Sequence, residues 1–262
     1  MTASVLLTGG TGTLGRLVLP RLREAGLAVR VLSRHPHESQ EEGIEYVVGD
    51  LAADTGVQAA VAEVDTIVHC AGTPKRDEFI ARNLVRAAAA GGSPHLVNIS
   101  VVGADRIPVT GRLDNAMFGY FAAKRAAERV VEGSGLPWTT LRATQFHDLV
   151  LTALKAMARL PVVPVPSGFR AQPVDAGEVA ARMVELALGE PAGLVPDMAG
   201  PTVHGMDELL RSYLQAAGLR RATVPLPLPG RAARAFREGA NLAPDRAVGT
   251  RTWEQFLAEQ GR

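Results

Sequence analysis

The chain has 262 residues, of which 47% are apolar and 21% charged, as is usual for a globular protein with a sizeable core. Its formal net charge of +1, from 28 basic and 27 acidic residues, predicts no strong field that would recruit nucleic acid or an anionic membrane. The single cysteine, Cys70, excludes an internal disulfide and a cysteine-rich metal site.

Strand-like and helix-like segments alternate from the N-terminus, which is typical of a parallel sheet covered by helices on both faces. Strands are predicted over Ser4–Thr8, Ala28–Ser33, Glu45–Val48, Asp65–His69, His95–Ser100 and Trp138–Arg142. Helices are predicted over Leu14–Ala25, Glu78–Ala90 and Gly119–Glu132. The sequence begins directly with a strand, without a basic leader, and has no run of about 18 apolar residues that could span a bilayer. We therefore expect a cytoplasmic α/β protein with a doubly wound parallel sheet.

The turn between the first strand and the first helix is rich in glycine, with the spacing G-x-x-G-x-x-G at Gly9, Gly12 and Gly15. One glycine allows a sharp turn, one lets backbone N–H groups approach an anion, and one lets the helix pack close to the strand. The alternative is a turn that binds nothing, but its place between strand and helix favours a dinucleotide site. The predicted diphosphate contacts are Gly9, Thr11, Gly12, Thr13, Leu14 and Gly15.

The second strand ends in Ser33 and Arg34, with no carboxylate before Glu38. A carboxylate at this position would bind the ribose hydroxyls of NAD. A guanidinium and a hydroxyl instead suit a phosphate, so the sequence predicts NADP(H), with the 2′-phosphate held by Ser33 and Arg34. The alternative is that Arg34 is an ordinary solvated surface residue.

Small and polar residues follow the next two strands and offer further cofactor contacts. Asp50 and Leu51 follow the third strand, where a short turn could seat the adenine, although Asp50 could instead cap a helix. Ala71 and Gly72 follow the fourth strand, where small residues let the backbone approach a ribose. Cys70 is interpreted as a small buried side chain rather than a reactive thiol.

Tyr120 and Lys124 are four residues apart on the helix predicted after the fifth strand, so both can point at one site. A lysine near a tyrosine favours the phenolate, and it can also hold the nicotinamide ribose. Tyr120 could then give a proton to a carbonyl while NADPH delivers hydride. Ser100, at the end of the fifth strand, could bond the same carbonyl or be an ordinary strand-end serine.

After the sixth strand, proline becomes frequent and the alternation loosens. We predict a dinucleotide domain over residues 1–142 and a small substrate region over 143–262, with helices over Glu178–Leu188 and Met206–Ala217. Pro225–Pro229 is interpreted as an extended connector that cannot be a central strand. The predicted pocket for a small-molecule substrate is lined by Gln145, Phe146, His147 and Val163–Phe169, although a lone histidine is more often structural. The histidines show no metal-ligand spacing.

Taken together, these motifs resemble the short-chain dehydrogenase/reductase superfamily, specifically its atypical NmrA-like, NAD(P)-binding branch. The segments that carry the resemblance are Thr8-Gly-Gly-Thr-Gly-Thr-Leu-Gly15, Ser33-Arg34, Gly49-Asp50-Leu51, Ile99-Ser100-Val-Val-Gly103, Tyr120-Phe-Ala-Ala-Lys-Arg-Ala-Ala-Glu128, Leu136-Pro-Trp-Thr-Thr-Leu-Arg142, Gln172-Pro-Val-Asp175 and Ala199-Gly-Pro201. The resemblance implies a Rossmann domain with a small C-terminal substrate region, and it assigns Ser100, Tyr120 and Lys124 to the superfamily's catalytic positions. One departure is Asp77, which stands about where the family has an asparagine.

Three functions follow as hypotheses from these residues and from the resemblance. The first is an NADPH-dependent oxidoreductase that acts on a small carbonyl, enone or quinone. The second is a non-catalytic NADP(H) redox sensor, because some NmrA-like proteins lack the tyrosine and act in that way. The third is a nucleotide-sugar epimerase or dehydratase, for which the C-terminal region is small. The presence of both Tyr120 and Lys124 favours catalysis.

Overall fold

The computed structural model describes residues 4–37, 42–73 and 76–260, which form two compact units whose segments alternate along the sequence. Unit 1 comprises Met1–Ser100, Ala123–Leu141 and Gly177–Pro196, and unit 2 comprises Val101–Ala122, Arg142–Ala176 and Asp197–Arg262. The expected boundary after residue 142 lies next to one crossing between the units, between Leu141 and Arg142. Residues 101–122 and 177–196 lie in the other unit from the one expected.

Within the described residues, unit 1 is built around a seven-stranded sheet in the order β3-β2-β1-β4-β5-β6-β9. Its strands are β1 (Ser4–Thr8), β2 (Ala28–Ser33), β3 (Ile44–Val48), β4 (Thr66–His69), β5 (His95–Val101), β6 (Trp138–Ala143) and β9 (Gly193–Leu194). β1 pairs in parallel with β2 and β4, β2 with β3, β4 with β5, and β6 with β9. The order 3-2-1-4-5-6 is that of a doubly wound fold, so the predicted fold class is confirmed.

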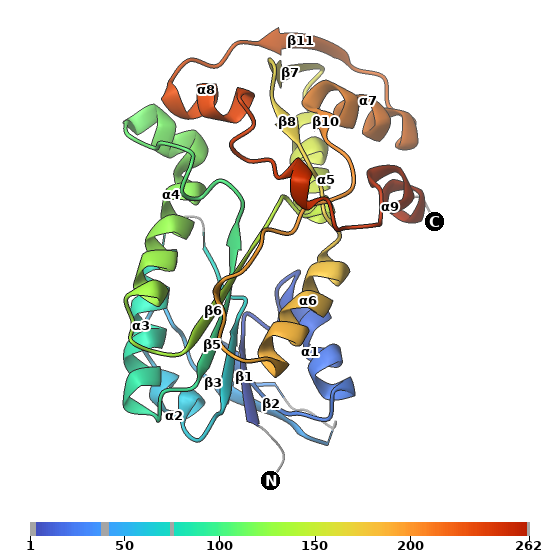
Figure 1. Cartoon of the computed structure of the whole chain (residues 1–262). Coiled ribbons are helices and arrows are strands. Elements are labelled where there is room, and N and C mark those ends of the chain that lie inside the picture. Colours follow the sequence, from blue (N-terminus) through green and yellow to red (C-terminus); the bar gives the residue numbers. More distant parts are fainter. Residues whose placement is uncertain (1–3, 38–41, 74–75, 261–262) are drawn as a thin grey trace. The chain divides into compact units, whose positions relative to one another are not determined.

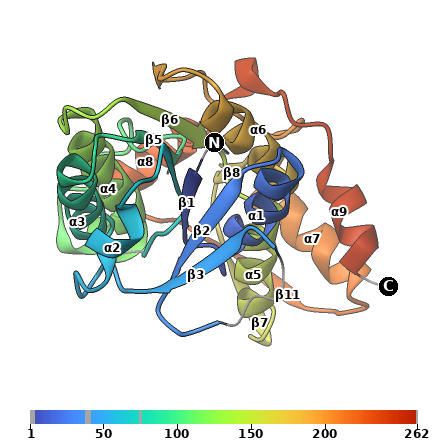
Figure 2. The same cartoon turned by 90° about the horizontal axis from the view of Figure 1, so that it is seen from below.

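Helices cover both faces of this sheet (Figures 1 and 2). The helices of unit 1 are α1 (Gly15–Glu24), α2 (Val57–Val61), α3 (Asp77–Ala90), the second half of α4 (Arg112–Glu132) and α6 (Ala176–Leu188). In both views α2, α3 and α4 lie on one face, and α1 and α6 on the other. Leu6, Ile67 and Leu96 of the sheet pack with Leu84 of α3 and Val131 of α4 in one buried core.

Unit 2 contains the first half of α4 and two small sheets surrounded by short helices. Its other elements are α5 (His147–Met157), β7 (Val162–Pro166), β8 (Arg170–Ala171), β10 (His204–Gly205), α7 (Met206–Ala216), β11 (Ala222–Leu226), α8 (Arg231–Arg237), η1 (Pro244–Arg246) and α9 (Trp253–Gln260). One core joins α5, α7 and α9, and a second gathers Phe118, Phe121 and Phe169 with Phe236 packed against them.

The proline-rich segment expected to be a connector is in part a strand. β11 includes Pro225 and pairs in parallel with β7 over its full length. Pro225 and Leu226 therefore belong to a paired strand, whereas the sequence predicted an extended connector. The exclusion of a central strand holds, because the sheet has only these two strands in the described part of the chain and each is an edge, where proline is tolerated.

Candidate functional site

The glycine turn that follows β1 is packed so tightly that side chains would not fit at two of its positions. Gly9 has a φ of +70°, and a Cβ there would lie 2.6 Å from the backbone nitrogen of Ala71. A Cβ on Gly15 would overlap the carbonyl oxygen of Gly9. The first contact seats the turn against the chain leaving β4, and the second seats α1 against the turn. This is the close packing for which the sequence pattern selects glycine.

The N-terminus of α1 has the features of an anion site. The first turn of any helix leaves N–H groups without an intrahelical acceptor, and these groups carry a partial positive charge. Leu14 precedes α1 without a side-chain cap, and the first turn of the helix contains no acidic residue. Thr11, Gly12 and Thr13 are exposed in front of it. The N–H groups of Arg16, Leu17 and Val18 already bond to the carbonyls of Gly12 and Leu14. A diphosphate would therefore be attracted mainly by the partial positive charge of the helix end, and the exposed turn in front of that end fits a dinucleotide.

The predicted 2′-phosphate residues lie at the end of β2. Ser33 is buried, and its hydroxyl accepts a hydrogen bond from the backbone N–H of His35 at 3.2 Å. Arg34 is exposed to solvent. The carboxyl ends of β1 and β2 are neighbours in the sheet, since the register pairs Thr8 with Leu32. Arg34 therefore follows the same edge from which the glycine turn leaves.

The adenine-side residues form a small closed loop after β3. The backbone of Asp50 pairs with that of Thr55, and the Asp50 carboxylate accepts the N–H of Ala52 at 2.7 Å. Leu51 is buried in the core of unit 1, and its carbonyl accepts a bond from Asn83. Asp50 thus stabilises its own turn rather than capping a helix, and the contact with adenine stays a prediction.

A buried hydrogen bond joins β1 and β4 directly beneath the glycine turn. The register places Thr8 opposite His69, and the Thr8 hydroxyl lies 2.7 Å from Nδ1 of the His69 ring. Burial lowers the pKa of His69 to about 4, with a further lowering by Lys124 and an opposing effect of Asp77. His69 is therefore neutral near pH 7 and serves as a hydrogen-bonding group. Its position at a strand end was the only available signal in the sequence.

Lys124, on α4, reaches the same edge of unit 1 in an ion pair. Its Nζ lies 3.0 Å from Oδ2 of Asp77, and the two side chains are only 11% and 3% exposed. Oδ1 of Asp77 accepts the backbone N–H of Thr73. A Cβ on the exposed Gly72 would lie 3.1 Å from Nζ. The structure thus brings Lys124 together with the predicted ribose residue Gly72.

Cys70, the only cysteine of the sequence, lies two residues before Gly72. Burial raises the pKa of its thiol to about 12, with a smaller opposing effect of Lys124. The thiol is therefore protonated and unreactive near pH 7, which agrees with its interpretation as a small packing residue.

Ser100 and Tyr120 differ in their exposure. Ser100, in β5, is buried, and its hydroxyl has no hydrogen-bond partner among the described residues. Tyr120 is 37% exposed in unit 2, with its ring edge-on to Phe121 at 5.7 Å. Lys124 follows one helical turn later on α4, which is a continuous helix across the division between the units. The catalytic roles of Ser100 and Tyr120 therefore stay predictions.

The predicted substrate residues Gln145, Phe146 and His147 differ in their contacts and in their burial. The Gln145 side chain lies 3.4 Å from the carbonyl of Asn241 and 3.5 Å from the N–H of Gln172, and Phe146 pairs with Val174. His147 begins α5, is fully buried and stacks on Phe256 with a centroid distance of 4.9 Å. A ring enclosed in this way does not reach a substrate, because aromatic side chains of α9 occupy its surroundings. We therefore leave His147 out of the proposed site.

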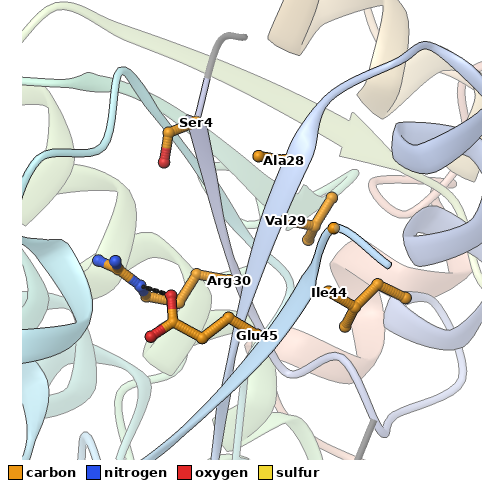
Figure 3. Close-up of a pocket in the computed structure, with 7 residues that line it drawn as sticks. Ser4, Ala28, Val29, Arg30, Ile44 and Glu45 are labelled. Carbon is orange, nitrogen blue, oxygen red and sulfur yellow. Dashed lines mark hydrogen bonds and ion pairs between the residues drawn. The ribbon is translucent and has the colours of Figure 1, made fainter. Parts of the chain in front are cut away.

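A surface hollow of about 250 Å³ lies at the amino ends of strands β1 to β3, opposite to the carboxyl ends from which the glycine turn leaves (Figure 3). Arg30 crosses it, with its Nε 2.8 Å from a Glu45 oxygen and its Nη1 2.7 Å from the carbonyl of Ala62. These contacts hold the end of α2 to the sheet. The hollow is therefore distinct from the edge that carries the glycine turn, and its charged groups already bind each other.

Among the described residues, none of the helices combines the length and the apolar character that a membrane span requires. The same residues include no group of three or more histidine, cysteine or acidic side chains arranged to hold a metal ion.

Comparison with known proteins places this chain among nucleotide-binding proteins. A family described as NAD(P)H-binding matches residues 9–188. A (4-alkanoyl-5-oxo-2,5-dihydrofuran-3-yl)methyl phosphate reductase from Streptomyces griseus is 32% identical over 56% of this chain. The chain spans only half the length of that relative. An NAD(P)H azoreductase from Xenophilus azovorans is 26% identical over 82% of this chain and 74% of its own length.

The fold itself is shared with solved structures. An NADPH-dependent quinone oxidoreductase from Escherichia coli, solved with NADPH, has a TM-score of 0.81 over 98% of this chain and 100% of its own. Its sequence is 18% identical, so the likeness concerns the fold alone.

Proposed function

Because this chain belongs to the NAD(P)H-binding family, we propose that it is an NADPH-dependent oxidoreductase of the atypical short-chain dehydrogenase/reductase type. Its substrate is a small carbonyl, enone or quinone. The observation that carries the proposal is the position of Lys124, whose ammonium lies beside Gly72 and Asp77 at the edge from which the glycine turn leaves. A cation from α4 is thus present next to a turn that fits a diphosphate.

The choice of NADPH over NADH rests on the end of β2. The cofactor contacts proposed in unit 1 are Gly9, Thr11, Gly12, Thr13, Leu14, Gly15, Ser33, Arg34, Asp50, Leu51, Ala71, Gly72 and Lys124. Arg34 is exposed, and the strand end Leu32-Ser33-Arg34-His35 contains no acidic residue. A guanidinium there supplies charge-assisted hydrogen bonds to a 2′-phosphate, which NADH lacks.

NADPH, when held by the glycine turn and the end of β2, would supply the hydride for reduction of the electrophilic carbon of the substrate. Tyr120 gives its phenolic proton to the carbonyl oxygen, so that the carbonyl becomes a hydroxyl group. Lys124 stabilises the phenolate that remains, since it stands one turn further along the same helix. Ser100 offers its buried hydroxyl to the same oxygen. The exposed Tyr120 recovers its proton from water.

The substrate class is supported by the printed activities of the two relatives, which are both reductases. One acts on a compound with an oxo-dihydrofuran ring, in which a carbonyl is conjugated, and the other on azo compounds. Conjugated acceptors of this kind take a hydride at one end and a proton at the other. Gln145 and Phe146 are the proposed substrate contacts in unit 2.

The test is stopped-flow measurement of NADPH absorbance across a panel of carbonyls, enones, quinones and azo dyes. We expect at least one acceptor to be reduced by the wild-type chain. Tyr120→Phe should lower turnover by at least about 100-fold with nearly unchanged NADPH affinity, because general acid catalysis contributes about 10²–10⁴-fold. Tyr213→Phe, a change of the same kind in α7, is the matched control and should retain activity.

Two outcomes would contradict the proposal. Full turnover by Tyr120→Phe would remove Tyr120 from the mechanism. Tight NADPH binding without turnover of any acceptor would favour a redox sensor instead.

A further inference from the structure

The ion pair between Asp77 and Lys124 is unusual in being almost completely buried. Transfer of an ammonium group out of water is costly unless a partner of opposite charge and further hydrogen bonds compensate for it. Asp77 supplies the opposite charge, since its Oδ2 lies 3.0 Å from Nζ. Its Oδ1 accepts the N–H of Thr73, whereas Oδ2 accepts no hydrogen bond of good geometry among the described residues and faces the ammonium as an ion-pair partner. The carboxylate is thereby fixed in orientation by the backbone of the segment that leaves β4.

Gly72 completes this arrangement by leaving room for the cation. A Cβ at Gly72 would come within 3.1 Å of Nζ and 3.4 Å of Oδ2 of Asp77. A Cβ at this position would therefore crowd the ammonium, while its contact with the carboxylate would be an ordinary one. The two charges also act on His69, whose pKa Lys124 lowers and Asp77 raises. Lys124 and Asp77 thus act electrostatically on the Thr8–His69 hydrogen bond within unit 1.

We propose that Asp77 is a positioning residue for Lys124, which it holds beside Gly72 so that the ammonium is already oriented when the dinucleotide binds. The inference rests on the proposed function, because it gives Lys124 its role toward cofactor and substrate. It adds a residue that does not itself touch either of them. Preorganisation of this kind matters because a displacement of about 1 Å in a catalytic group can cost about 100-fold in rate.

A purely structural role for Asp77 is the competing explanation. Asp77 begins α3, and an acidic residue in the first turn stabilises a helix through its dipole. Glu78 has the same helical advantage, but it is exposed and pairs with Arg82 on the surface. Glu78→Gln therefore removes a negative charge from the start of α3 without touching Lys124, and it is the matched control for Asp77→Asn.

The first experiment is a double-mutant cycle in the full chain with Asp77→Asn, Lys124→Met and the double variant. We expect Asp77→Asn to lower kcat about 10- to 100-fold, with the KM of the acceptor changed less than about twofold. In the Lys124→Met background, Asp77→Asn should have no further effect on kcat or on NADPH affinity. Asp77→Glu, which keeps the charge, should restore part of the activity.

The second experiment needs neither cofactor nor turnover. Trace labelling with acetic anhydride followed by mass spectrometry compares the reactivity of Lys124 with that of the exposed Lys155. We expect the Lys124/Lys155 ratio to rise several-fold in Asp77→Asn and to stay at the wild-type value in Glu78→Gln. Thermal unfolding of each variant at the labelling pH shows whether a change in the Lys124/Lys155 ratio is caused by loss of folded structure.

The outcomes separate this inference from the proposed function. A wild-type chain that binds NADPH without reducing any acceptor contradicts the oxidoreductase, while labelling and NADPH affinity still decide the role of Asp77. An unchanged labelling ratio in Asp77→Asn overturns the inference. A further loss of kcat or NADPH affinity on adding Asp77→Asn to Lys124→Met does so as well.

Discussion

At the scale of single residues, the choice between the two nicotinamide cofactors depends on Arg34. Arg34→Ala should weaken the binding of NADPH by about 1.5–3 kcal/mol, because a hydrogen bond to a charged group is lost. NADH lacks the 2′-phosphate, so its affinity should change little. Fluorescence titration of both reduced cofactors measures the two affinities. Arg82→Ala, a second exposed arginine in unit 1, is the control, and equal losses for NADPH and NADH would contradict the phosphate assignment.

The sequence was informative about residues whose role depends on local backbone shape. The tight packing at Gly9 and Gly15 follows from the spacing of a strand–turn–helix motif, and the structure has it. It was uninformative about partners that are remote in the chain. The bond between Thr8 and His69 joins residues 61 positions apart, and the pairing of Lys124 with Asp77 depends on where α3 and α4 lie. His147 is buried by aromatic residues of α9, and the local sequence around His147 cannot predict this contact.

At the scale of elements, the junction of β1, the turn and α1 should not tolerate a methyl group at Gly15. A Cβ there would overlap the Gly9 carbonyl oxygen, so the turn and the helix must separate. We expect Gly15→Ala to destabilise the protein by about 1–3 kcal/mol and to weaken NADPH binding at least about tenfold. Urea unfolding and fluorescence titration measure the two effects. Gly111→Ala, where a Cβ would meet nothing within 4 Å, is the control.

A Gly15→Ala variant with wild-type stability and NADPH affinity would show that the turn and the helix can separate without cost, and it would contradict this prediction. A variant that is destabilised but binds NADPH normally would separate the turn's structural role from its proposed ligand role.

Element boundaries were predictable where the apolar pattern changes sharply and less so elsewhere. The strands match their predicted ranges within a residue at either end, because each is a short apolar run. The start of α4 was expected at Gly119 but lies at Arg112. The buried Asp114 carboxylate lies 3.4 Å from the N–H and 3.3 Å from the hydroxyl of Thr110, which stabilises an earlier start. The exposed Leu113 and Met117 hide the helical pattern of this first half.

At the scale of the whole molecule, the doubly wound parallel sheet could be predicted because strands and helices largely alternate in the first half of the sequence. Among the described residues of that half, only β2 and β3 follow each other without a helix between them. The interleaving of the two units could not be predicted. Residues 177–196 return to unit 1, where β9 pairs with β6 and α6 covers one face of the sheet. A two-residue strand such as β9 has no periodicity to detect, and only its pairing in space assigns it to that sheet.

The stability of the fold should depend on pH through His69. The pKa of its ring is about 4 in the folded protein, against 6.5 for an unperturbed histidine such as that of an unfolded chain. Between these values the unfolded chain binds a proton that the folded chain does not, so the free energy of unfolding falls as the pH is lowered from 6.5 toward 4. The loss attributable to His69 is at most about 3 kcal/mol, and above the upper value His69 contributes no pH dependence.

Urea unfolding at intervals from about pH 7 to pH 4 measures this dependence. His69→Asn keeps a hydrogen-bonding group near the Thr8 hydroxyl and removes the titration, so its stability should fall less steeply over the same range. His95→Gln is the matched control, because burial lowers the pKa of His95 too, but that side chain is only partly buried. His95→Gln should therefore reduce the pH dependence of the free energy of unfolding less than His69→Asn does. Parallel curves for His69→Asn and the wild type would mean that His69 takes up its proton without unfolding, and the neutral Thr8–His69 bond would then not be required beneath the glycine turn.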